Sequence, residues 1–200
     1  MTEIAIVYYS GFGHTKKIAE EIAKGAEASG AAVTLFDSDT ATERLDDLDN
    51  SDAIIFGSPT YMGGVAGPFK VFTDATSKKW ASLAWKDKIA AGFTNSGSYS
   101  GDKQGTLIYL MTFAMQHGMI WVGLPEMTRT EPEDEGETTR EKRHGAPPEA
   151  INRLGSFSGL MAQSDNAPPE ETPSPGDIKT AHLFGKRVAE ATERWINARS

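Results

Sequence analysis

The chain alternates short apolar runs with amphipathic segments of helical period, and this alternation constrains its fold more than any other feature. "EIAIVYYS" at 3–10 is apolar on both alternating faces, and "DAIIFGSPT" at 52–60 is again a continuous apolar run. Strands of this kind are covered on both sides, as in a parallel sheet between layers of helices. Residues 31–37, 88–97 and 119–123 predict three further strands. The sequence therefore predicts an α/β fold around a five-stranded parallel sheet.

Helices are expected between these strands and at the end of the chain. Residues 14–30 form an amphipathic pattern, and 68–77 and 105–118 predict two more helices. The segment "GDIKTAHLFGKRVAEATERWINA" has the same period and begins with Asp177 as its expected N-cap. The sequence contains no internal repeats, and we expect one domain that spans residues 1–200.

Residues 125–177 break the alternating pattern because they are rich in proline, glutamate, serine and glycine. From 126 to 177 the chain holds 12 acidic and 5 basic residues, whereas the whole chain has a net charge of −8. The segment has too few large apolar residues to fold alone. We interpret it as a long, irregular, acidic insertion near the fifth strand, on a core that is almost neutral.

Composition excludes several classes of site. Without cysteine, the chain has no disulfide, thiolate metal site or cysteine nucleophile, and its four histidines show no ligand spacing, so we expect no metal. The negative net charge argues against nucleic acid as the main partner. No apolar stretch approaches the roughly 20 residues of a membrane span. Because residues 2–9 already form a predicted strand, we expect no signal peptide and a cytoplasmic protein.

Three polar, glycine-rich loops follow the first, third and fourth predicted strands, at the edge where open parallel sheets bind ligands. "SGFGHT" at 10–15 precedes a helix and offers N–H groups, hydroxyls and an imidazole to one phosphate. "SPTYMGGVAG" at 58–67 presents Tyr61 to a flat ring, and "TNSGSYSGD" at 94–102 carries Tyr99 at its crest. Each loop alone could be an ordinary turn, but the three together suit a mononucleotide such as FMN.

The motifs also resemble those of the flavodoxin superfamily, and within it the NAD(P)H:quinone oxidoreductases once named Trp-repressor-binding proteins. "YYSGFGHT" is similar to the Y-Y-S-x-x-G-H phosphate loop of that family, and "GSPTYMGG" to its G-x-P-T-[RY]-[FM]-G flavin loop. "QHGM" at 116–119 resembles its H-H-G-M, and "KKWASL" at 78–83 resembles its L-W-A-S. The resemblance covers residues 2–123 and the last helix, and it implies a flavodoxin-like, doubly wound fold that binds FMN.

Carried over to this sequence, the resemblance implies that residues 10–15 hold the FMN phosphate and that the second and third loops flank the flavin. It also brings His117 to the isoalloxazine, within the chain or from a neighbouring subunit, and makes Trp80 a wall of the substrate pocket. Without the family, His117 is equally an ordinary helix cap and Trp80 ordinary core packing. The expected cofactor-binding residues are Ser10, Gly11, Phe12, Gly13, His14, Thr15, Pro59, Thr60, Tyr61, Met62, Gly63, Ser96, Gly97, Ser98, Tyr99, Ser100, Gly101, Asp102 and His117.

The resemblance implies an FMN-dependent oxidoreductase that passes two electrons from NAD(P)H to quinones and forms a dimer or tetramer. No side chain need act as an acid or base, although His117 could stabilise the reduced ring. The alternative is an electron-carrier flavodoxin, which Tyr99 favours if it stacks on the flavin. A third interpretation is a flavodoxin-like domain that binds a partner without FMN. The sequence departs from the family in "SYSGD", where a glycine run is typical, and in "GSFSG" at 155–159.

Overall fold

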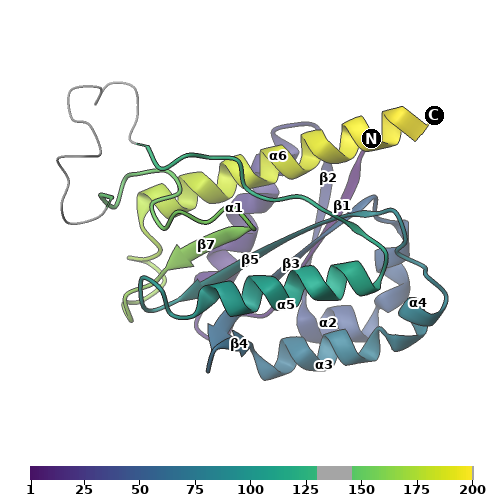
Figure 1. Cartoon of the computed structure of the whole chain (residues 1–200), viewed down its shortest axis with the longest axis horizontal. Coiled ribbons are helices and arrows are strands. Elements are labelled where there is room, and N and C mark those ends of the chain that lie inside the picture. Colours follow the sequence, from purple (N-terminus) through teal and green to yellow (C-terminus); the bar gives the residue numbers. More distant parts are fainter. Residues whose placement is uncertain (130–145, 200) are drawn as a thin grey trace.

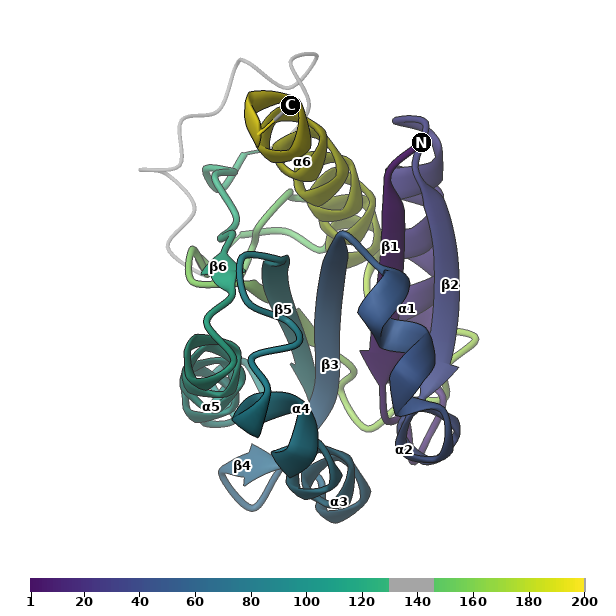
Figure 2. The same cartoon turned by 90° about the vertical axis from the view of Figure 1, so that its right-hand side faces the viewer.

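The computed structural model describes residues 1–129 and 146–199, which form a sheet between two layers of helices (Figure 1). The strands are β1 (Glu3–Tyr8), β2 (Ala32–Asp37), β3 (Ala53–Tyr61), β4 (Gly64–Val65), β5 (Ile89–Ser96), β6 (Ile120–Trp121) and β7 (Leu160–Gln163). The central strands run parallel in the order β2-β1-β3-β5-β6, as the turned view in Figure 2 shows. β4 pairs antiparallel with β3, and β7 pairs parallel with β5.

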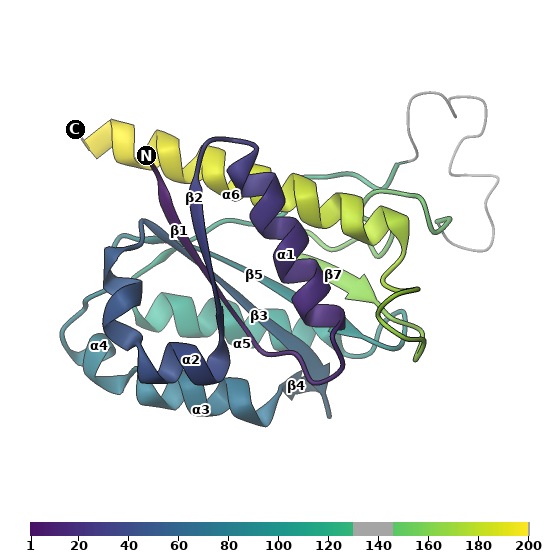
Figure 3. The same ribbon diagram turned by 180° about the vertical axis from the view of Figure 1, so that it is seen from behind.

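The helices cover both faces of this sheet. They are α1 (His14–Glu27), α2 (Ser38–Glu43), α3 (Gly67–Ala75), α4 (Ser77–Ala81), α5 (Lys103–Gln116) and α6 (Pro175–Arg199), with a 3-10 turn at Leu45–Asn50. α1 and α6 pack on one face, and α2, α3 and α5 pack on the other (Figure 3). Successive residues of β1, such as Ile6 and Val7, are buried in opposite layers. This two-sided burial explains why the strands are continuous apolar runs.

Helices α1 and α6 meet almost backbone to backbone. A Cβ atom at Gly25 would lie 1.9 Å from the carbonyl oxygen of His182, and one at Gly185 would lie 1.9 Å from that of Ile22. Neither position can hold a larger residue unless the helices separate. The two glycines therefore set the distance between α1 and α6.

The predicted α/β class and parallel sheet are confirmed, but the strand count is wrong, because the sheet has seven strands. β5 pairs with β3 along one edge, and β6 and β7 share its other edge. β6 pairs with Ile89 and Ala90, and β7 pairs with residues 93–96. Two short strands, β6 and β7, thus take the place beside β5 where one longer fifth strand was predicted. β6 lies inside the predicted strand 119–123, whereas β4 and β7 were not predicted, because strands of two and four residues give no long apolar run.

The interpretation of 125–177 as irregular throughout is also wrong. β7 lies inside this segment, and α6 begins at Pro175, so Asp177 is in the first helical turn rather than at the N-cap. Ser174 accepts the Asp177 N–H through Oγ at 3.3 Å. The Asp177 carboxylate instead forms a buried ion pair with Arg153. Residues 130–145, the most acidic part of the predicted insertion, lie outside the described residues.

Among the helices of the described residues, none has the length and apolar character needed to cross a bilayer.

Candidate functional site

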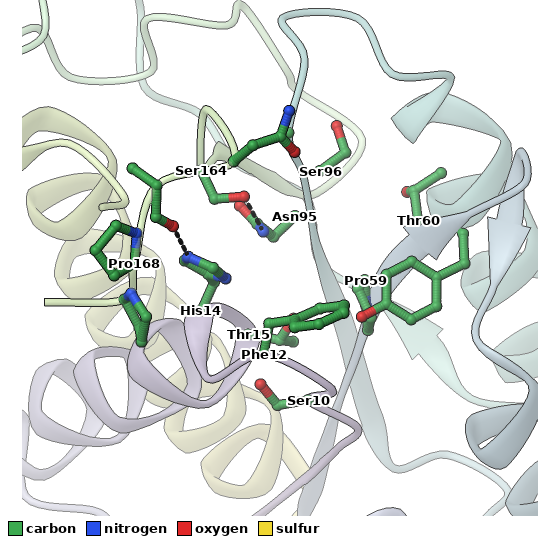
Figure 4. A pocket seen from close by; sticks show the side chains of 15 residues that line it. Ser10, Phe12, His14, Thr15, Pro59, Thr60, Asn95, Ser96, Ser164 and Pro168 are labelled. Carbon is green, nitrogen blue, oxygen red and sulfur yellow. Dashed lines mark hydrogen bonds between the residues drawn. The ribbon is translucent and has the colours of Figure 1, made fainter. Parts of the chain in front are cut away.

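A cavity of about 510 Å³ lies at the carboxyl ends of β1, β3, β5 and β7 (Figure 4). Its volume falls in the range that suits small organic ligands. It lies at the edge of the sheet where the three loops were predicted to meet. Its lining residues are Ser10, Phe12, His14, Thr15, Pro59, Thr60, Tyr61, Asn95, Ser96, Gly97, Ser164, Asn166, Ala167, Pro168 and Pro169.

The loop between β1 and α1 is built to present N–H groups. Gly13 has a φ of 91°, which glycine adopts without strain, and α1 begins immediately after it. Ser10 Oγ accepts the N–H groups of Gly13 and Lys16, each at 3.1 Å, and so closes the loop. The N–H groups of His14 and Thr15 have no acceptor among the described residues. A helix N-terminus with free N–H groups facing a cavity favours an anion such as a phosphate.

Two aromatic rings line the mouth of the cavity. Phe12 and Tyr61 meet edge to face, with ring centroids 6.3 Å apart, and remain 74% and 38% exposed. A Cβ atom at Gly11 would lie 2.7 Å from the Tyr61 hydroxyl oxygen, so glycine at this position allows the tyrosine to lie across the loop. An exposed pair of this kind offers apolar ring surface to a flat ligand.

Tyr61 is held by a tight hairpin rather than by the flexible loop that its glycines suggest. β3 and β4 pair through Tyr61 and Gly64. The two residues between them, Met62 and Gly63, have φ values of 48° and 81°. Positive φ at both positions is typical of a type I′ turn. The Met62 side chain is fully exposed, so it does not line the cavity.

The wall formed by β5 carries a polar atom without a partner. Asn95 is buried, and its Nδ2 donates to Ser164 Oγ at 3.0 Å, but its Oδ1 accepts no hydrogen bond in the described part of the chain. Beside it, Thr60 Oγ1 lies 2.8 Å from Thr94 Oγ1 and 2.7 Å from Thr106 Oγ1. A buried acceptor without a donor is costly, and a ligand N–H group would satisfy it. The donor set therefore fits a ring that carries a phosphate at one end and polar edge groups at the other.

Residues 164–172, which the sequence analysis did not assign to the site, close the cavity opposite the aromatic pair. The imidazole of His14 bonds through Nε2 to the Ala167 carbonyl oxygen at 2.8 Å. Lys17 Nζ donates to the carbonyl oxygens of Pro169 at 2.7 Å and Thr172 at 3.3 Å. These contacts tie the segment to α1. They also use the imidazole nitrogen that was predicted as a phosphate donor. The short apolar "LMAQ" followed by "SDNAPP" is the signal of a strand end that could have identified this wall.

The structure brings the first two predicted loops and the start of the third together, but not the rest of the third. Ser96 and Gly97 line the cavity, whereas Ser98 to Asp102 turn away from it. Tyr99 lies with its ring centroid 5.5 Å from the guanidinium carbon of Arg153 and lines a neighbouring depression. The expectation that 98–102 flank the same space as Tyr61 is therefore not met. Pairing with Arg153, which the sequence could not place, is the physical reason.

His117 and Trp80 lie in a different cavity, of about 490 Å³, between α3, α4 and α5. His117 follows the last residue of α5 and so lies at the end of that helix away from the third loop. Only 2% of it is exposed, and its ring stacks on Trp85 with centroids 4.5 Å apart. His117 therefore does not line the cavity that contains Tyr61, and its contact with a flavin across a subunit boundary stays a prediction. Trp80, half exposed on α4, is likewise remote from the aromatic pair.

The protonation of His117 follows from its partners. Thr76 Oγ1 donates to the Thr73 carbonyl oxygen at 2.7 Å, so it accepts the hydrogen bond from His117 Nε2 at 3.0 Å. Nδ1 is then the unprotonated nitrogen, and it has no partner among the described residues. Burial lowers the pKa of His117 from 6.5 to about 4. His117 is therefore neutral at pH 7 and part of the core.

Comparison with known proteins agrees with this architecture. A family model described as "Flavodoxin domain" matches residues 5–117. Over 189 residues the chain is 40% identical to "Flavodoxin FldP" of Pseudomonas aeruginosa, covering 94% of this chain and 96% of that protein. It is 30% identical over 217 residues to "NAD(P)H dehydrogenase (quinone)" of Archaeoglobus fulgidus, covering 97% and 99%.

A solved structure gives the same result. The flavodoxin, WrbA-like protein from Agrobacterium tumefaciens matches with a TM-score of 0.72 and 38% identity, covering 97% of this chain and 99% of that one. The family model covers more than half of the chain, and the relatives are covered almost from end to end. The resemblance inferred from the sequence motifs is thus confirmed, and the chain belongs to the flavodoxin family.

Proposed function

We propose that the protein is an FMN-dependent oxidoreductase that transfers two electrons from NAD(P)H to a quinone. FMN, when bound, supplies the redox chemistry, and the chain binds it, orients it and limits access to it. In this proposal the N–H groups of His14 and Thr15 and the Ser10 hydroxyl bind the phosphate. Tyr61 and Phe12 contact the ring, and Asn95 Oδ1 accepts a ring N–H group.

The position of Tyr99 is the observation that favours an oxidoreductase over an electron-carrier flavodoxin. An electron carrier of the kind considered above has aromatic rings on both sides of its flavin. Here Tyr99 is paired with Arg153, outside the cavity, and among the described residues that line the cavity Tyr61 and Phe12 are the only Phe, Tyr or Trp side chains. In our proposal no second aromatic side chain stacks on the flavin, and a nicotinamide and then a quinone take that place in turn. The relatives named NAD(P)H dehydrogenase (quinone) support the same assignment.

The second candidate is an electron-carrier flavodoxin. Its support is the relative of 40% identity, which carries the name Flavodoxin FldP. Under this alternative the acidic chain, with a net charge of −8, attracts basic redox partners. In that case Tyr99 leaves Arg153 when FMN binds and covers the second side of the ring.

A single domain over residues 1–200 and assembly into a dimer or tetramer belong to the same proposal. The single domain rests on the chain length and the lack of internal repeats, and the assembly rests on the family resemblance. His117 lines the second cavity beside Trp80, and its contact with a flavin from a neighbouring copy stays a prediction of the family resemblance.

Steady-state kinetics of the FMN-saturated protein test the proposal. NADH or NADPH is mixed with benzoquinone, and the loss of nucleotide absorbance is compared with the quinol formed. An oxidoreductase consumes one nucleotide per quinone over many turnovers, and Tyr61→Ala slows it more than Tyr61→Phe. A carrier binds FMN and shows no turnover beyond that of free FMN. A protein that binds no FMN contradicts both candidates.

A further inference from the structure

A lysine without any exposed surface lies directly behind the third loop. Lys103 is the first residue of α5 and is 0% exposed. Its Nζ donates to Ser96 Oγ at 2.8 Å, to the Ser98 carbonyl oxygen at 2.5 Å and to the Tyr99 carbonyl oxygen at 2.8 Å. An ammonium has three donors, and all three bind the segment from 96 to 99.

The contacts of Lys103 require its charged form. Three acceptors surround Nζ, and a neutral amine has only two protons, so its lone pair would face an oxygen. Burial lowers the pKa of Lys103 to about 8, which still leaves the ammonium as the main form at pH 7. Lys103 is therefore a buried cation with complete hydrogen bonding.

No carboxylate in the described part of the chain forms a hydrogen bond or ion pair with Lys103 Nζ. The charged groups that act on it are Asp177 of α6, Asp165 and Arg153. Arg153 binds both carboxylate oxygens of Asp177, at 3.0 and 3.2 Å, and largely neutralises it, while Asp165 is exposed to water. Neither carboxylate contacts Nζ, so the direct partners of this cation among the described residues are all neutral oxygens.

Ser96 connects this charge with the cavity. Its hydroxyl accepts from Lys103 Nζ, and the residue lines the cavity on the side away from Ser10 (Figure 4). A Cβ atom at Gly101 would lie 2.1 Å from Ser96 Oγ, so the glycine leaves room for this contact. The cation therefore lies one hydrogen bond from the end of the cavity opposite the anion-binding loop.

We propose that Lys103 is a positioning residue that orders the segment from 96 to 99 and stabilises the negative charge that a ring held against Ser96 gains on reduction. The inference rests on the proposed function. Hydride transfer breaks the C–H bond of the reduced nicotinamide, which leaves as a cation, and adds one hydrogen and one net negative charge to the flavin. A buried cation whose direct partners are all neutral is suited to that added charge, because the interior screens it weakly.

The test compares FMN affinity with redox potential in the wild type, Lys103→Gln and Lys103→Met. Gln104→Ala, which changes the neighbouring residue, is the matched control. We expect both Lys103 variants to lose at least tenfold more affinity for reduced than for oxidised FMN. That difference lowers the two-electron midpoint potential by about 30 mV or more at pH 7. Equal losses of the two affinities, with an unchanged potential, would reduce Lys103 to a structural role and overturn the proposal.

A second measurement needs no variant and applies if the substitutions prevent folding. Reduction of the ring should raise the pKa of Lys103, so above pH 8 reduction takes up one additional proton. Above pH 8 the slope of the wild-type midpoint potential against pH then becomes steeper by about 30 mV per pH unit, the value for one additional proton in a two-electron couple. A constant slope from pH 7 to 9.5 contradicts the proposal. If the wild type binds no FMN, the proposed function itself fails. If it binds FMN but its potential changes neither with the Lys103 variants nor in slope above pH 8, only the role of Lys103 is removed.

Discussion

Stability between pH 7 and pH 5 should depend strongly on His117. Its pKa is lowered by burial to about 4 in the folded protein and returns to about 6.5 on unfolding. Between these values the unfolded chain binds more protons, so the free energy of unfolding decreases as the pH falls from 6.5 towards 4. The linkage relation gives a loss of about 2 kcal/mol from pH 7 to pH 5.

Urea unfolding of the FMN-free protein, followed by far-ultraviolet circular dichroism at both pH values, measures this loss. His117→Phe keeps a flat ring between Trp85 and Phe113, and Thr76 can still donate to Thr73. We expect this variant to lose no more than about 0.5 kcal/mol over the same interval, because it has no proton to bind at this position. His182→Gln, at a partly exposed histidine, controls for the removal of any histidine. A wild type that is equally stable at both pH values, or a phenylalanine variant that loses as much as the wild type, would refute the reasoning.

Substitutions in the phosphate loop, between α1 and α6, and in the β3–β4 turn test three other parts of the structure. Ser10→Ala removes the acceptor of two loop N–H groups and should weaken FMN binding about tenfold, or ~1.4 kcal/mol, with little change in melting temperature; an unchanged dissociation constant counts against the phosphate loop. Gly25→Ala and Gly185→Ala should each destabilise the fold by about 1–3 kcal/mol in urea unfolding, since each forces α1 and α6 apart. Gly64→Ala, which has open space around it, is their control, and equal effects at all three sites would contradict the packing. Met62→Gly should raise the unfolding free energy by up to about 1 kcal/mol by removing left-handed strain without losing a contact; a loss of stability would show that the turn does not hold Met62 at positive φ.

Much of the fold could be predicted because its strands are buried on both faces. Residues such as Ile6, Ile55 and Ala91 lie in the layer of α1 and α6, so the apolar runs that contain them are visible in the sequence. β7 was missed because its four residues lie among small polar ones, and pairing with β5 rather than its own composition defines it. The ion pair between Arg153 and Asp177 was missed for a related reason, since only the tertiary structure brings the two residues together.

The candidate site could be predicted where a loop directly follows a long strand. Ser10, Thr15, Thr60 and Tyr61 meet in one cavity for this reason. The segment 164–169 follows a strand that the sequence did not reveal, so its part in the site was also missed. The expected place of His117 came from a motif, which gives the identity of a residue but not its surroundings, here the rings of Trp85 and Phe113.

The most direct test of the central claim is anaerobic mixing of the FMN-saturated protein with NADPH or NADH while the flavin absorbance is recorded. The account predicts fast, complete bleaching by at least one nucleotide and recovery when benzoquinone is added. It also predicts faster bleaching than that of free FMN under the same conditions. The contradicting result is a bound flavin that neither NADH nor NADPH reduces but that dithionite reduces through a long-lived one-electron state. That result would support the electron carrier instead of the enzyme.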